Sequence, residues 1–313
     1  MKRQNLKRTM SAVLILAVVL IPFYALYATQ IWPPWITQPA GGKHFTVAQY
    51  DNVPDLHGEI ENPQLVVFFA GNQFMVIADL VKAFREQYPE YKRIYLETLP
   101  PGILEDQIDQ GGLVMGNLKI TVQPDIFTGG KGRIASLQKE KDWFANTVDY
   151  ARNRLAIMVY KGNPKNIKSL ADFARDDVNV SMPNPQWEGI GKHIVQAYKN
   201  VGGEKLANTI MKTKVDNGST FLTHIHHRQT PVRIMLKESD AGAVWYTEAN
   251  FQQMIDNPIQ MIEIPDKDNE QVTYTAGSMK SAPHPEAAKR FLDFLMSDRG
   301  QAVYKKYGFM PPK

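Results

Sequence analysis

Residues 284–313 read HPEAAKRFLDFLMSDRGQAVYKKYGFMPPK, and this stretch carries the most informative pattern of the chain. Pro285 suits the first position of a helix. One face of that helix is apolar, because hydrophobic side chains recur at helical spacing at Ala288, Phe291, Leu292 and Leu295. Ser297 can cap a second helix, and Gly308 is placed to end it in a left-handed conformation. The stretch therefore predicts two short consecutive helices.

The segments before this stretch alternate between predicted strands and helices. Residues 65–70, LVVFFA, form a continuous apolar run that is typical of a strand buried on both faces. The helix that follows has an apolar stripe at Ile77, Leu80, Val81 and Phe84. Further strands are predicted at 93–97, 124–128, 154–160, 178–182 and 243–247, and further helices at 103–111 and 191–200. This alternation indicates a largely parallel sheet covered by helices, and the roughly 250 residues from position 64 onward are enough for two lobes.

Several of these segments match the motifs of one protein family. The C-terminal stretch agrees in order and spacing with the motif aa-x-x-F-x-x-F-L-x-S-x-x-G-Q-x-x-x-x-x-Y-G-F. Similar motifs of the same family fall at residues 67–74, 125–130, 151–155, 169–173 and 240–249. Along most of its length from residue 64, the chain resembles the type II periplasmic solute-binding proteins of ABC transporters, in particular the molybdate-, tungstate- and sulfate-binding family.

That resemblance implies a fold and a function. The fold would be α/β and two-lobed, periplasmic-binding-protein-like (type II), with a ligand cleft between the lobes and two crossover strands. The protein would capture a small anion by hinge closure and deliver it to a membrane permease whose energy comes from a separate ATPase. An oxyanion such as molybdate, tungstate or sulfate is expected ahead of an organic anion. We expect no catalysis, no cofactor and no nucleic-acid partner, and we expect a monomer.

The predicted domain limits follow from the same pattern. Residues 64–152 and 249–313 are assigned to lobe 1, and residues 153–248 to lobe 2. Residues 29–63 contain many tryptophan, proline and glycine residues without a sustained apolar period, so they are predicted to form an extended lead-in. Residues 1–28 are predicted to be a signal peptide or an N-terminal membrane anchor.

The N-terminal residues indicate export to the periplasm or the cell surface. An uncharged apolar run from 10 to 28 follows four basic residues, which are Lys2, Arg3, Lys7 and Arg8. The whole chain has 36 basic and 32 acidic residues, so removal of this segment leaves a formally neutral protein. No cluster of basic and aromatic residues typical of nucleic-acid binding is present. The sequence has no cysteine, which excludes disulfides and a lipid-anchored cysteine.

The resemblance and the ends of the predicted strands together define a candidate ligand site. Its predicted members are Asn72, Gln73, Phe74, Thr98, Thr128, Gly129, Asn153, Gln186, Trp187, Gly189, His227, Arg228, Thr230, Trp245 and Tyr246. Three of them, Gln186, Trp187 and Gly189, fall in the loop 184–191 between a strand and a helix, where α/β sheets present ligand-binding groups. The composition of that loop, taken alone, predicts only a turn.

Three residues depart from the family and leave the ligand open. Asn72 and Gln73 stand where the family has serine hydroxyls, and Trp245 replaces a tyrosine. Side-chain amides and the N–H groups of a helix start could bind a dehydrated oxyanion, and they could equally bind a polar organic anion. Asn72 has an alternative role as a helix cap, and Trp245 has one as a core residue.

Three histidines lie close together in residues 223–231, THIHHRQTP. In an extended segment His224 and His226 would point the same way and His227 the opposite way, so His224 and His226 are weak candidates for metal ligands. Alternatively, Thr230 caps a helix, and His226, His227 and Arg228 precede that helix as a cationic lip for an anion. A solvated loop between the lobes remains a third interpretation.

Two functions from other classes stay open at this stage. An uncleaved N-terminal segment would favour a membrane-tethered sensor that uses the same closure. The histidines would favour a metal-binding protein or a metal-dependent hydrolase. The sequence contains no phosphate-binding loop and no G-x-S-x-G or H-E-x-x-H motif that would indicate another enzyme class.

Overall fold

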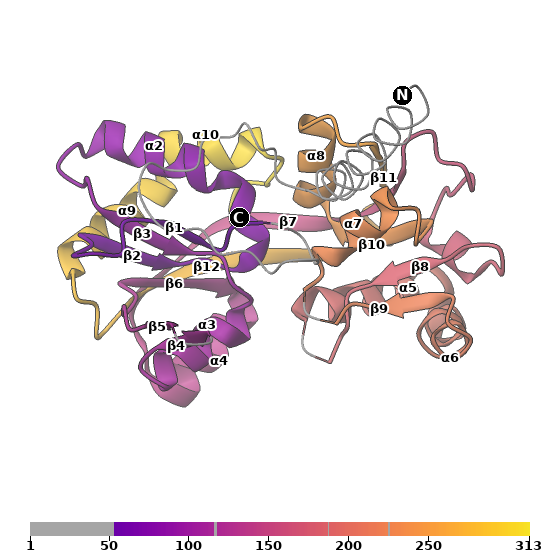
Figure 1. The fold of residues 1–313 in the computed structure, drawn as a ribbon, viewed down its shortest axis with the longest axis horizontal. Coiled ribbons are helices and arrows are strands. Elements are labelled where there is room, and N and C mark those ends of the chain that lie inside the picture. Colours follow the sequence, from indigo (N-terminus) through magenta and orange to yellow (C-terminus); the bar gives the residue numbers. More distant parts are fainter. Residues whose placement is uncertain (1–52, 116–117, 187, 225) are drawn as a thin grey trace, which may run out of the picture.

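In a computed structural model of the protein, residues 53–115, 118–186, 188–224 and 226–313 are described. Two lobes lie side by side, and long strands connect them (Figure 1). The predicted signal or anchor, residues 1–28, lies outside the described residues, as does the lead-in up to residue 52. Among the described residues, no helix has both the length and the apolar character needed to span a membrane.

The first lobe is built on a mixed sheet. Its strands follow the order β1, β3, β2, β6, β12 and β7. Their bounds are β1 Leu56–Gly58, β3 Ile94–Glu97, β2 Leu65–Phe68, β6 Ile126–Gly130, β12 Gln271–Met279 and β7 Phe144–Tyr160. β2 pairs in parallel with β3 and β6, as predicted, but β12 pairs antiparallel with β6 and β7, so the expectation of a largely parallel sheet was wrong. β1 adds an antiparallel edge strand from within the predicted lead-in.

The second lobe continues the same sheet path. Beyond β7 the order is β10 (Ala241–Trp245), β8 (Val180–Met182) and β9 (Thr220–Leu222). β11 (Ile259–Glu263) also pairs with β7. A separate hairpin of β4 (Leu113–Met115) and β5 (Leu118–Ile120) extends from the first lobe.

The long strand β7 belongs to both lobes. Its first part, Phe144 to Arg154, pairs with β12, and its last part, Leu155 to Tyr160, pairs with β10 and β11. The sequence predicted only residues 154–160, because Leu155 to Val159 are apolar and buried, whereas the first part contains polar residues and an exposed run, Ala145 to Thr147, without a regular alternation. Asn153 therefore lies where the strand passes from one lobe to the other, and the return strand β12 is the second connection.

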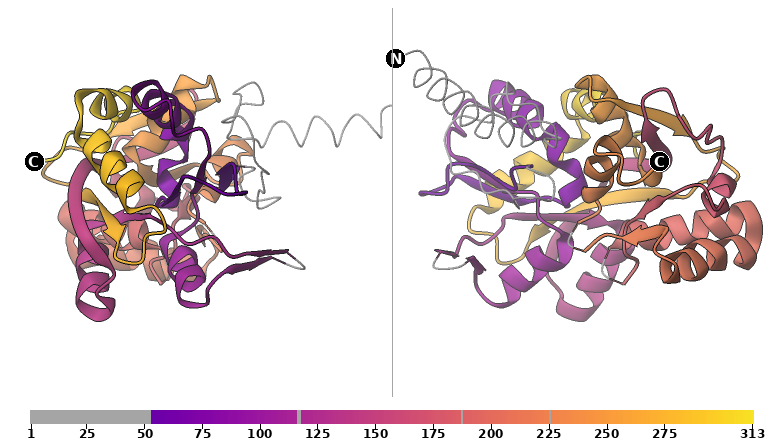
Figure 2. Two further views of the ribbon diagram at one scale, coloured as in Figure 1. Left: turned by 90° about the vertical axis from the view of Figure 1, so that its left-hand side faces the viewer. Right: turned by 45° about the vertical axis from the view of Figure 1, so that its right-hand side comes forward.

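The C-terminal stretch forms the two predicted helices, α9 (Pro285–Met296) and α10 (Asp298–Lys306). The Ser297 hydroxyl accepts a hydrogen bond from the Gly300 N–H and caps α10, and Gly308 has a positive φ of 90°. These helices pack beside α2 (Ile77–Gln87), with the Phe84 ring centroid 5.1 Å from that of Phe291 (Figure 2). The sequence prediction for this region is confirmed.

The remaining described helices pack around the sheet. They are η1 (Gly71–Val76), α3 (Pro101–Asp109), α4 (Lys131–Lys141), η2 (Leu170–Ala174), α5 (Gly189–Asn208), η3 (Thr209–Thr213), α6 (Lys214–Asp216), α7 (Gln229–Met235) and α8 (Tyr246–Met254). Some of them, such as α4 and α8, begin directly after a strand.

The start of α7 differs from the prediction. The helix begins at Gln229, two residues before Pro231, so Thr230 lies inside it and not at its cap. The Gln229 and Thr230 N–H groups donate to the carbonyls of His226 and His227, which extends the first turn backward. Pro231 is still tolerated because it lies in that first turn, where a missing N–H costs little. The helix buries Val232 and Ile234, and Leu236, directly after its end, is exposed.

Each lobe has its own apolar core. In the first lobe the core includes Val67, Phe84 and Phe291, and in the second it includes Ile157, Ile194 and Ala243. Helix α8 contributes Ala249 to a cluster of the second lobe and Phe251 to the core of the first. The predicted limits of the lobes, at residues 152/153 and 248/249, remain a prediction.

Candidate functional site

The loops that follow the strands of the two lobes meet in one region. Gly71, at the start of η1 in the first lobe, lies against His226 of the second lobe. A Cβ atom at Gly71 would come within 2.9 Å of His226 Nε2 and 2.7 Å of the Thr98 carbonyl oxygen. Only glycine therefore permits this approach without a shift of the Thr98 backbone. In α/β proteins, ligands bind at such ends of strands.

Uncharged polar side chains on the first-lobe side form a buried group that we call the neutral cluster. Its members are Asn72, Gln73, Thr128, Tyr150, Tyr274 and Tyr304. The Gln73 Oε1 atom accepts hydrogen bonds from the hydroxyls of Tyr150, at 2.9 Å, and Tyr304, at 3.1 Å. Asn72 donates its amide to the Tyr274 hydroxyl. The Asn72 side chain thus bonds to a residue of β12, and this described residue does not act as a helix cap.

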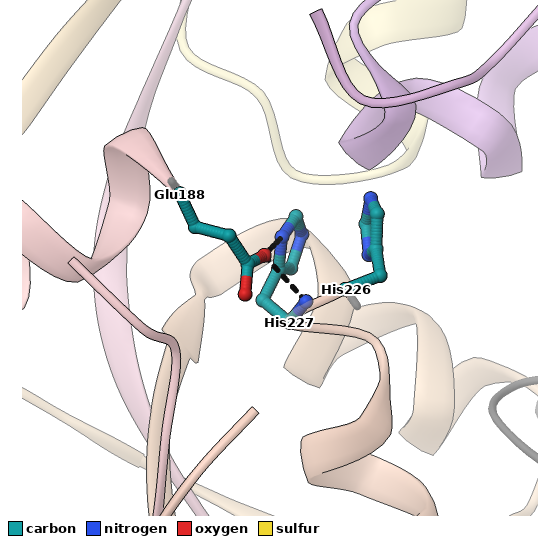
Figure 3. Close-up of side chains that lie close together, drawn as sticks. All are labelled: Glu188, His226 and His227. Carbon is teal, nitrogen blue, oxygen red and sulfur yellow. Dashed lines mark hydrogen bonds and ion pairs between the residues drawn. The ribbon is translucent and has the colours of Figure 1, made fainter. Parts of the chain in front are cut away.

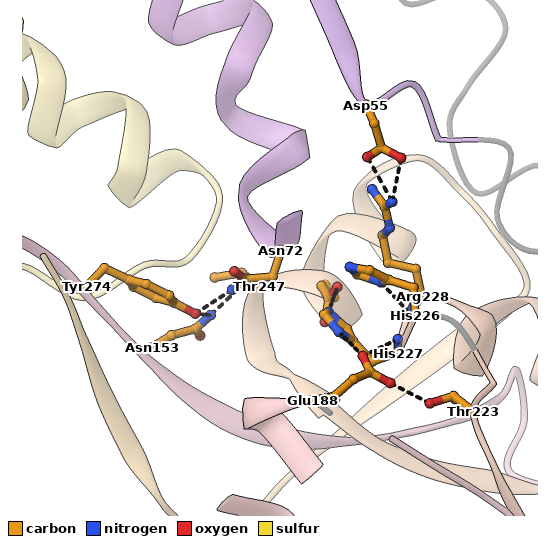
Figure 4. A network of polar contacts seen from close by, with 11 residues as sticks. Asp55, Asn72, Asn153, Glu188, Thr223, His226, His227, Arg228, Thr247 and Tyr274 are labelled. Carbon is orange, nitrogen blue, oxygen red and sulfur yellow. Dashed lines mark hydrogen bonds and ion pairs between the residues drawn. The ribbon is translucent and has the colours of Figure 1, made fainter. Parts of the chain in front are cut away.

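The crossover residue Asn153 extends the neutral cluster toward the second lobe. Its amide donates to the Thr247 hydroxyl at 3.0 Å and to the Tyr274 hydroxyl at 3.5 Å (Figure 4). Trp245 lies beside it, buried in the second-lobe core with its ring centroid 6.3 Å from that of Tyr274. Trp245 thus fills the core role that the sequence left open.

Ionisable side chains, most of them from the second lobe, form a second buried group that we call the charged cluster. Its members are Asp55, Glu188, His226, His227, Arg228 and Glu248. His227 lies between two carboxylates, with Nδ1 2.7 Å from Glu188 Oε2 and Nε2 2.9 Å from Glu248 Oε1. The Thr223 hydroxyl donates to the other oxygen of Glu188 at 2.5 Å (Figure 4).

The charged cluster fixes the protonation of its two histidines in opposite ways. Burial lowers the pKa of His227, but the Glu248 and Glu188 carboxylates outweigh this effect and raise the pKa to about 10. His227 is therefore an imidazolium that donates to both carboxylates. Burial holds the pKa of His226 well below its usual value, and the charges of Arg228 and His227 act in the same direction. His226 is therefore neutral, and its Nδ1 accepts a hydrogen bond from the Arg228 N–H at 3.1 Å.

Arg228 connects the charged cluster to the first lobe. Its guanidinium lies 2.9 Å and 3.1 Å from the two carboxylate oxygens of Asp55, and the side chains of Arg228 and Asp55 are only 2% and 4% exposed. The Thr98 hydroxyl also donates to Asp55 Oδ1 at 3.2 Å. The predicted ligand residues Thr98 and Arg228 thus hold a carboxylate that belongs to the chain itself.

Several predicted residues lie outside these two clusters. Gln186 and Gly189 are exposed, Tyr246 lies under the Arg154 guanidinium, and Thr230 Oγ1 pairs with Ser181 Oγ at 2.9 Å. His224 is exposed and its ring contacts Phe221, so it does not join His226. Gly129 pairs with Thr275 within the sheet, and Phe74 packs against Phe251. Trp187 lies outside the described residues.

Two pockets on the described surface lie away from this region. One is lined by residues that include Asn62, Arg93 and His284, and the other by residues that include Val148 and Met279. No predicted ligand residue lines either pocket. The side chains between the lobes are instead buried against one another.

Comparison with known proteins identifies the family of the chain. The sequence model described as "Bacterial extracellular solute-binding protein" matches residues 65–310. The chain belongs to this family. Membership confirms the expectation of a binding protein and not an enzyme.

The curated relatives of this solute-binding protein have names from the same class. A Bacillus subtilis protein named as a substrate-binding lipoprotein of an ABC transporter is 22% identical over 165 residues, which cover 52% of this chain and 58% of that protein. The molybdate-binding protein ModA of Mycobacterium tuberculosis H37Rv is 23% identical over 169 residues, which cover 52% and 56% of the two chains. The match thus spans little more than half the length of these relatives.

A solved structure confirms the predicted fold of this solute-binding protein. The periplasmic molybdate-binding protein of Azotobacter vinelandii superposes with a TM-score of 0.64 at 16% identity, covering 80% of this chain and 100% of that chain. The two-lobed α/β fold with two connecting strands is therefore the fold of periplasmic binding proteins.

Sequence reasoning missed three members of the charged cluster of this solute-binding protein. Glu188 lies inside the loop 184–191, from which Gln186, Trp187 and Gly189 were predicted as ligand residues but Glu188 was not. Glu248 lies in the motif at 240–249, where the family has an aspartate, so the motif could have indicated it. Asp55 lies in the predicted lead-in, and no motif or pattern in the sequence indicated a role for it.

Proposed function

We propose that this protein is the extracytoplasmic substrate-binding component of an ABC-type importer, which captures a small anion and delivers it to a membrane permease. The protein acts as a monomer, and its lobes close on the ligand by a hinge in β7 and β12. The predicted limits, 64–152 with 249–313 and 153–248, are the moving units. Molybdate, tungstate and sulfate are the first candidate ligands, ahead of organic anions, and the names of the relatives support this order.

The observation that carries the proposal is the carboxylate held between the lobes. Arg228 of the second lobe and Thr98 of the first both bond to Asp55, whose side chain is 4% exposed. Charge-assisted hydrogen bonds of this kind are stronger than neutral ones, and a guanidinium fits carboxylates and oxyanions alike. A free anion can take the place of the Asp55 carboxylate and would then contact both lobes, as a ligand that favours closure must.

The neutral cluster supports the proposal from the first-lobe side. The amides of Asn72 and Gln73 are oriented by the hydroxyls of Tyr274, Tyr150 and Tyr304, which leaves few free side-chain rotations to be lost on binding. Uncharged donors of this type can bind an oxyanion without a counter-ion.

Calorimetric titration of the purified full chain with molybdate, tungstate, sulfate and a panel of carboxylates tests the proposal. We expect saturable binding of one anion per chain. Asp55→Asn removes the internal competitor and should strengthen binding by about tenfold or more, whereas Arg228→Gln should weaken it by about 30-fold, because a buried charged hydrogen bond contributes on the order of 2 kcal/mol. Arg233→Gln is the matched control, since Arg233 lies on α7, which Arg228 directly precedes, and pairs with Glu238. Anion binding that is equal in Arg228→Gln and Arg233→Gln would contradict the proposal.

We also propose that residues 1–28 direct export and place the protein in the periplasm or at the cell surface. The basic residues followed by an apolar run support this assignment. N-terminal sequencing of the exported protein distinguishes a cleaved signal, which gives a start near residue 29, from a retained anchor. Recovery of the whole protein from the cytoplasm would contradict the proposed location.

A further inference from the structure

We propose that Glu188, His226 and His227 form a binding site for one divalent transition-metal ion of the zinc class, separate from the anion site at Arg228. The three side chains are buried, and one potential ligand atom from each lies within 4.8 Å of the others (Figure 3). Two imidazoles and a carboxylate are typical zinc ligands. The site goes beyond the proposed function, because capture of an anion does not require it.

The spacing of the ligand atoms suits a metal ion after small side-chain movements. Zinc bonds to nitrogen and oxygen at about 2.0–2.2 Å, which places tetrahedral ligand atoms about 3.4 Å apart. His227 Nδ1 and Glu188 Oε2 lie 2.7 Å apart and must separate slightly, while His226 must approach. The rings of His226 and His227 are already neighbours, with centroids 4.1 Å apart.

Outer contacts around the three residues match those of known metal sites. The second ring nitrogen of His227 lies 2.9 Å from Glu248 Oε1, and the second oxygen of Glu188 accepts a bond from the Thr223 hydroxyl. A histidine ligand whose other nitrogen donates to a carboxylate is the usual arrangement in zinc proteins, because it fixes the ring orientation and the tautomer. Here Glu248 orients His227 with Nδ1 toward Glu188.

The charges of the cluster also favour a cation. Asp55, Glu188 and Glu248 supply three carboxylates, whereas Arg228 supplies one guanidinium. A divalent ion held by Glu188 and two neutral histidines adds two positive charges and brings the formal charge of this buried group to zero. Burial of uncompensated charge is costly, so the excess of carboxylates favours a bound cation.

All three ligand residues belong to the second lobe, so metal binding does not require the two lobes to close. Glu188 precedes α5, and His226 and His227 precede α7. The anion site, by contrast, needs Arg228 from the second lobe and Thr98 from the first. Metal binding should therefore survive in a protein that cannot close, and three protein ligands leave a fourth position for water or an anion.

Titration of the full chain with zinc(II) tests the site. The protein is purified in mild detergent with a tag that contains no histidine, and is stripped with EDTA. We expect one zinc(II) per chain and a visible absorption of tetrahedral cobalt(II) when cobalt replaces zinc. His226→Asn and Glu188→Gln should weaken zinc binding by at least about 100-fold, and Glu248→Gln by about 10- to 100-fold.

The matched control is His224→Asn, because His224 lies in the same segment but is exposed and outside the cluster. It should leave zinc affinity unchanged. His226→Asn keeps an acceptor for the Arg228 N–H and so preserves the local backbone. Thermal unfolding without metal checks that each variant is folded.

Three results would overturn the site: no stoichiometric zinc on the wild-type chain, equal affinity in His226→Asn and wild type, or loss of zinc in His224→Asn. If Glu188→Gln does not fold, X-ray absorption spectroscopy of the zinc-loaded wild-type protein replaces it. Two imidazoles and a carboxylate oxygen bound to zinc support the site, and any other set of zinc ligands contradicts it. Anion titrations in EDTA keep the two proposals apart. Zinc binding without anion binding contradicts only the proposed function, and the reverse contradicts only the metal site.

Discussion

The neutral cluster joins amides to tyrosine and threonine hydroxyls, whereas the charged cluster joins carboxylates to an imidazole and a guanidinium. Both are buried, and they face each other between the lobes (Figure 4). Each neutral hydrogen bond contributes about 1 kcal/mol to the free energy of unfolding, and this contribution does not depend on pH. The effect of a buried charge on stability, in contrast, depends strongly on its partner, because removal of one partner leaves the other desolvated and unpaired.

This difference assigns different roles to the two clusters. The neutral cluster acts as a scaffold that orients donors and tolerates the loss of a single bond. In the charged cluster one partner can be replaced by another with the same sign of charge: a proton by a metal ion, or a carboxylate by a free anion. Both proposals therefore depend on the charged cluster, and the following experiments test how far the two clusters differ.

The largest expected effect is that of His227→Ala in the presence of EDTA. This change leaves Glu188 and Glu248 buried without their shared cation, so it should lower the free energy of unfolding by about 4 kcal/mol. Urea denaturation measures the loss. His224→Ala serves as the control and should have little effect, because His224 is exposed. Equal losses in the two variants would remove the distinction between the clusters.

The second test uses pH. The folded-state pKa of His227, about 10, lies above the unfolded value of about 6.5, so the folded protein binds more protons between these values. This contribution to stability is fully present below about pH 6.5 and is lost as the pH rises toward 10. Burial raises the pKa of Glu97 to about 7, so its contribution changes mainly below that pH.

Urea denaturation from about pH 7.5 to about pH 9.5 therefore isolates His227. We expect the free energy of unfolding to fall with pH in the wild type and to change much less in His227→Gln. Parallel pH profiles for the two proteins would show that Glu188 and Glu248 do not hold the proton on His227.

The third test breaks the ion pair between the lobes. Asp55→Ala leaves Arg228 without the Asp55 carboxylate and should cost about 3 kcal/mol of stability. Glu86→Ala is the control, because Glu86 pairs with Arg299 in an exposed ion pair, which contributes little. A loss in Asp55→Ala no larger than that in Glu86→Ala would contradict the view that the buried carboxylate binds both lobes together.

The smallest expected effect lies in the neutral cluster. Tyr304→Phe removes one of the two hydroxyls that donate to Gln73, and Tyr150 retains the other. The free energy of unfolding should fall by about 1 kcal/mol, with the same loss at pH 7 and pH 9 within error. A loss as large as that of His227→Ala would mean that the neutral cluster is as sensitive as the charged one.

The parts of the fold that the sequence predicted are those with strong local patterns. The helices α2 and α9 show an apolar stripe at helical spacing, and β2 is a continuous apolar run of strand length. The first part of β7 was missed, because its polar residues alternate too weakly to indicate a strand without the partner β12.

Within the site, the sequence indicated loops more reliably than contacts. Asn72, Gln73, Thr98, Thr128, Asn153, His227 and Arg228 were predicted and lie in or beside the two clusters. The sequence left three interpretations of the histidines open: an extended segment in which His224 and His226 point the same way, a cationic lip before a helix, and a solvated loop. In the structure α7 begins at Gln229, two residues earlier than predicted, and the rings of His226 and His227 are neighbours.

By itself, the sequence determined the family, the two-lobed α/β class and the loops that carry the polar residues, because these follow from motifs and apolar periods within short segments. Only the tertiary structure decided which charges meet. Glu188 is 39 residues from His227, and Asp55 is 173 residues from Arg228. Such pairs form because the fold buries them together, and the high cost of an unpaired buried charge selects the partner regardless of its distance along the chain.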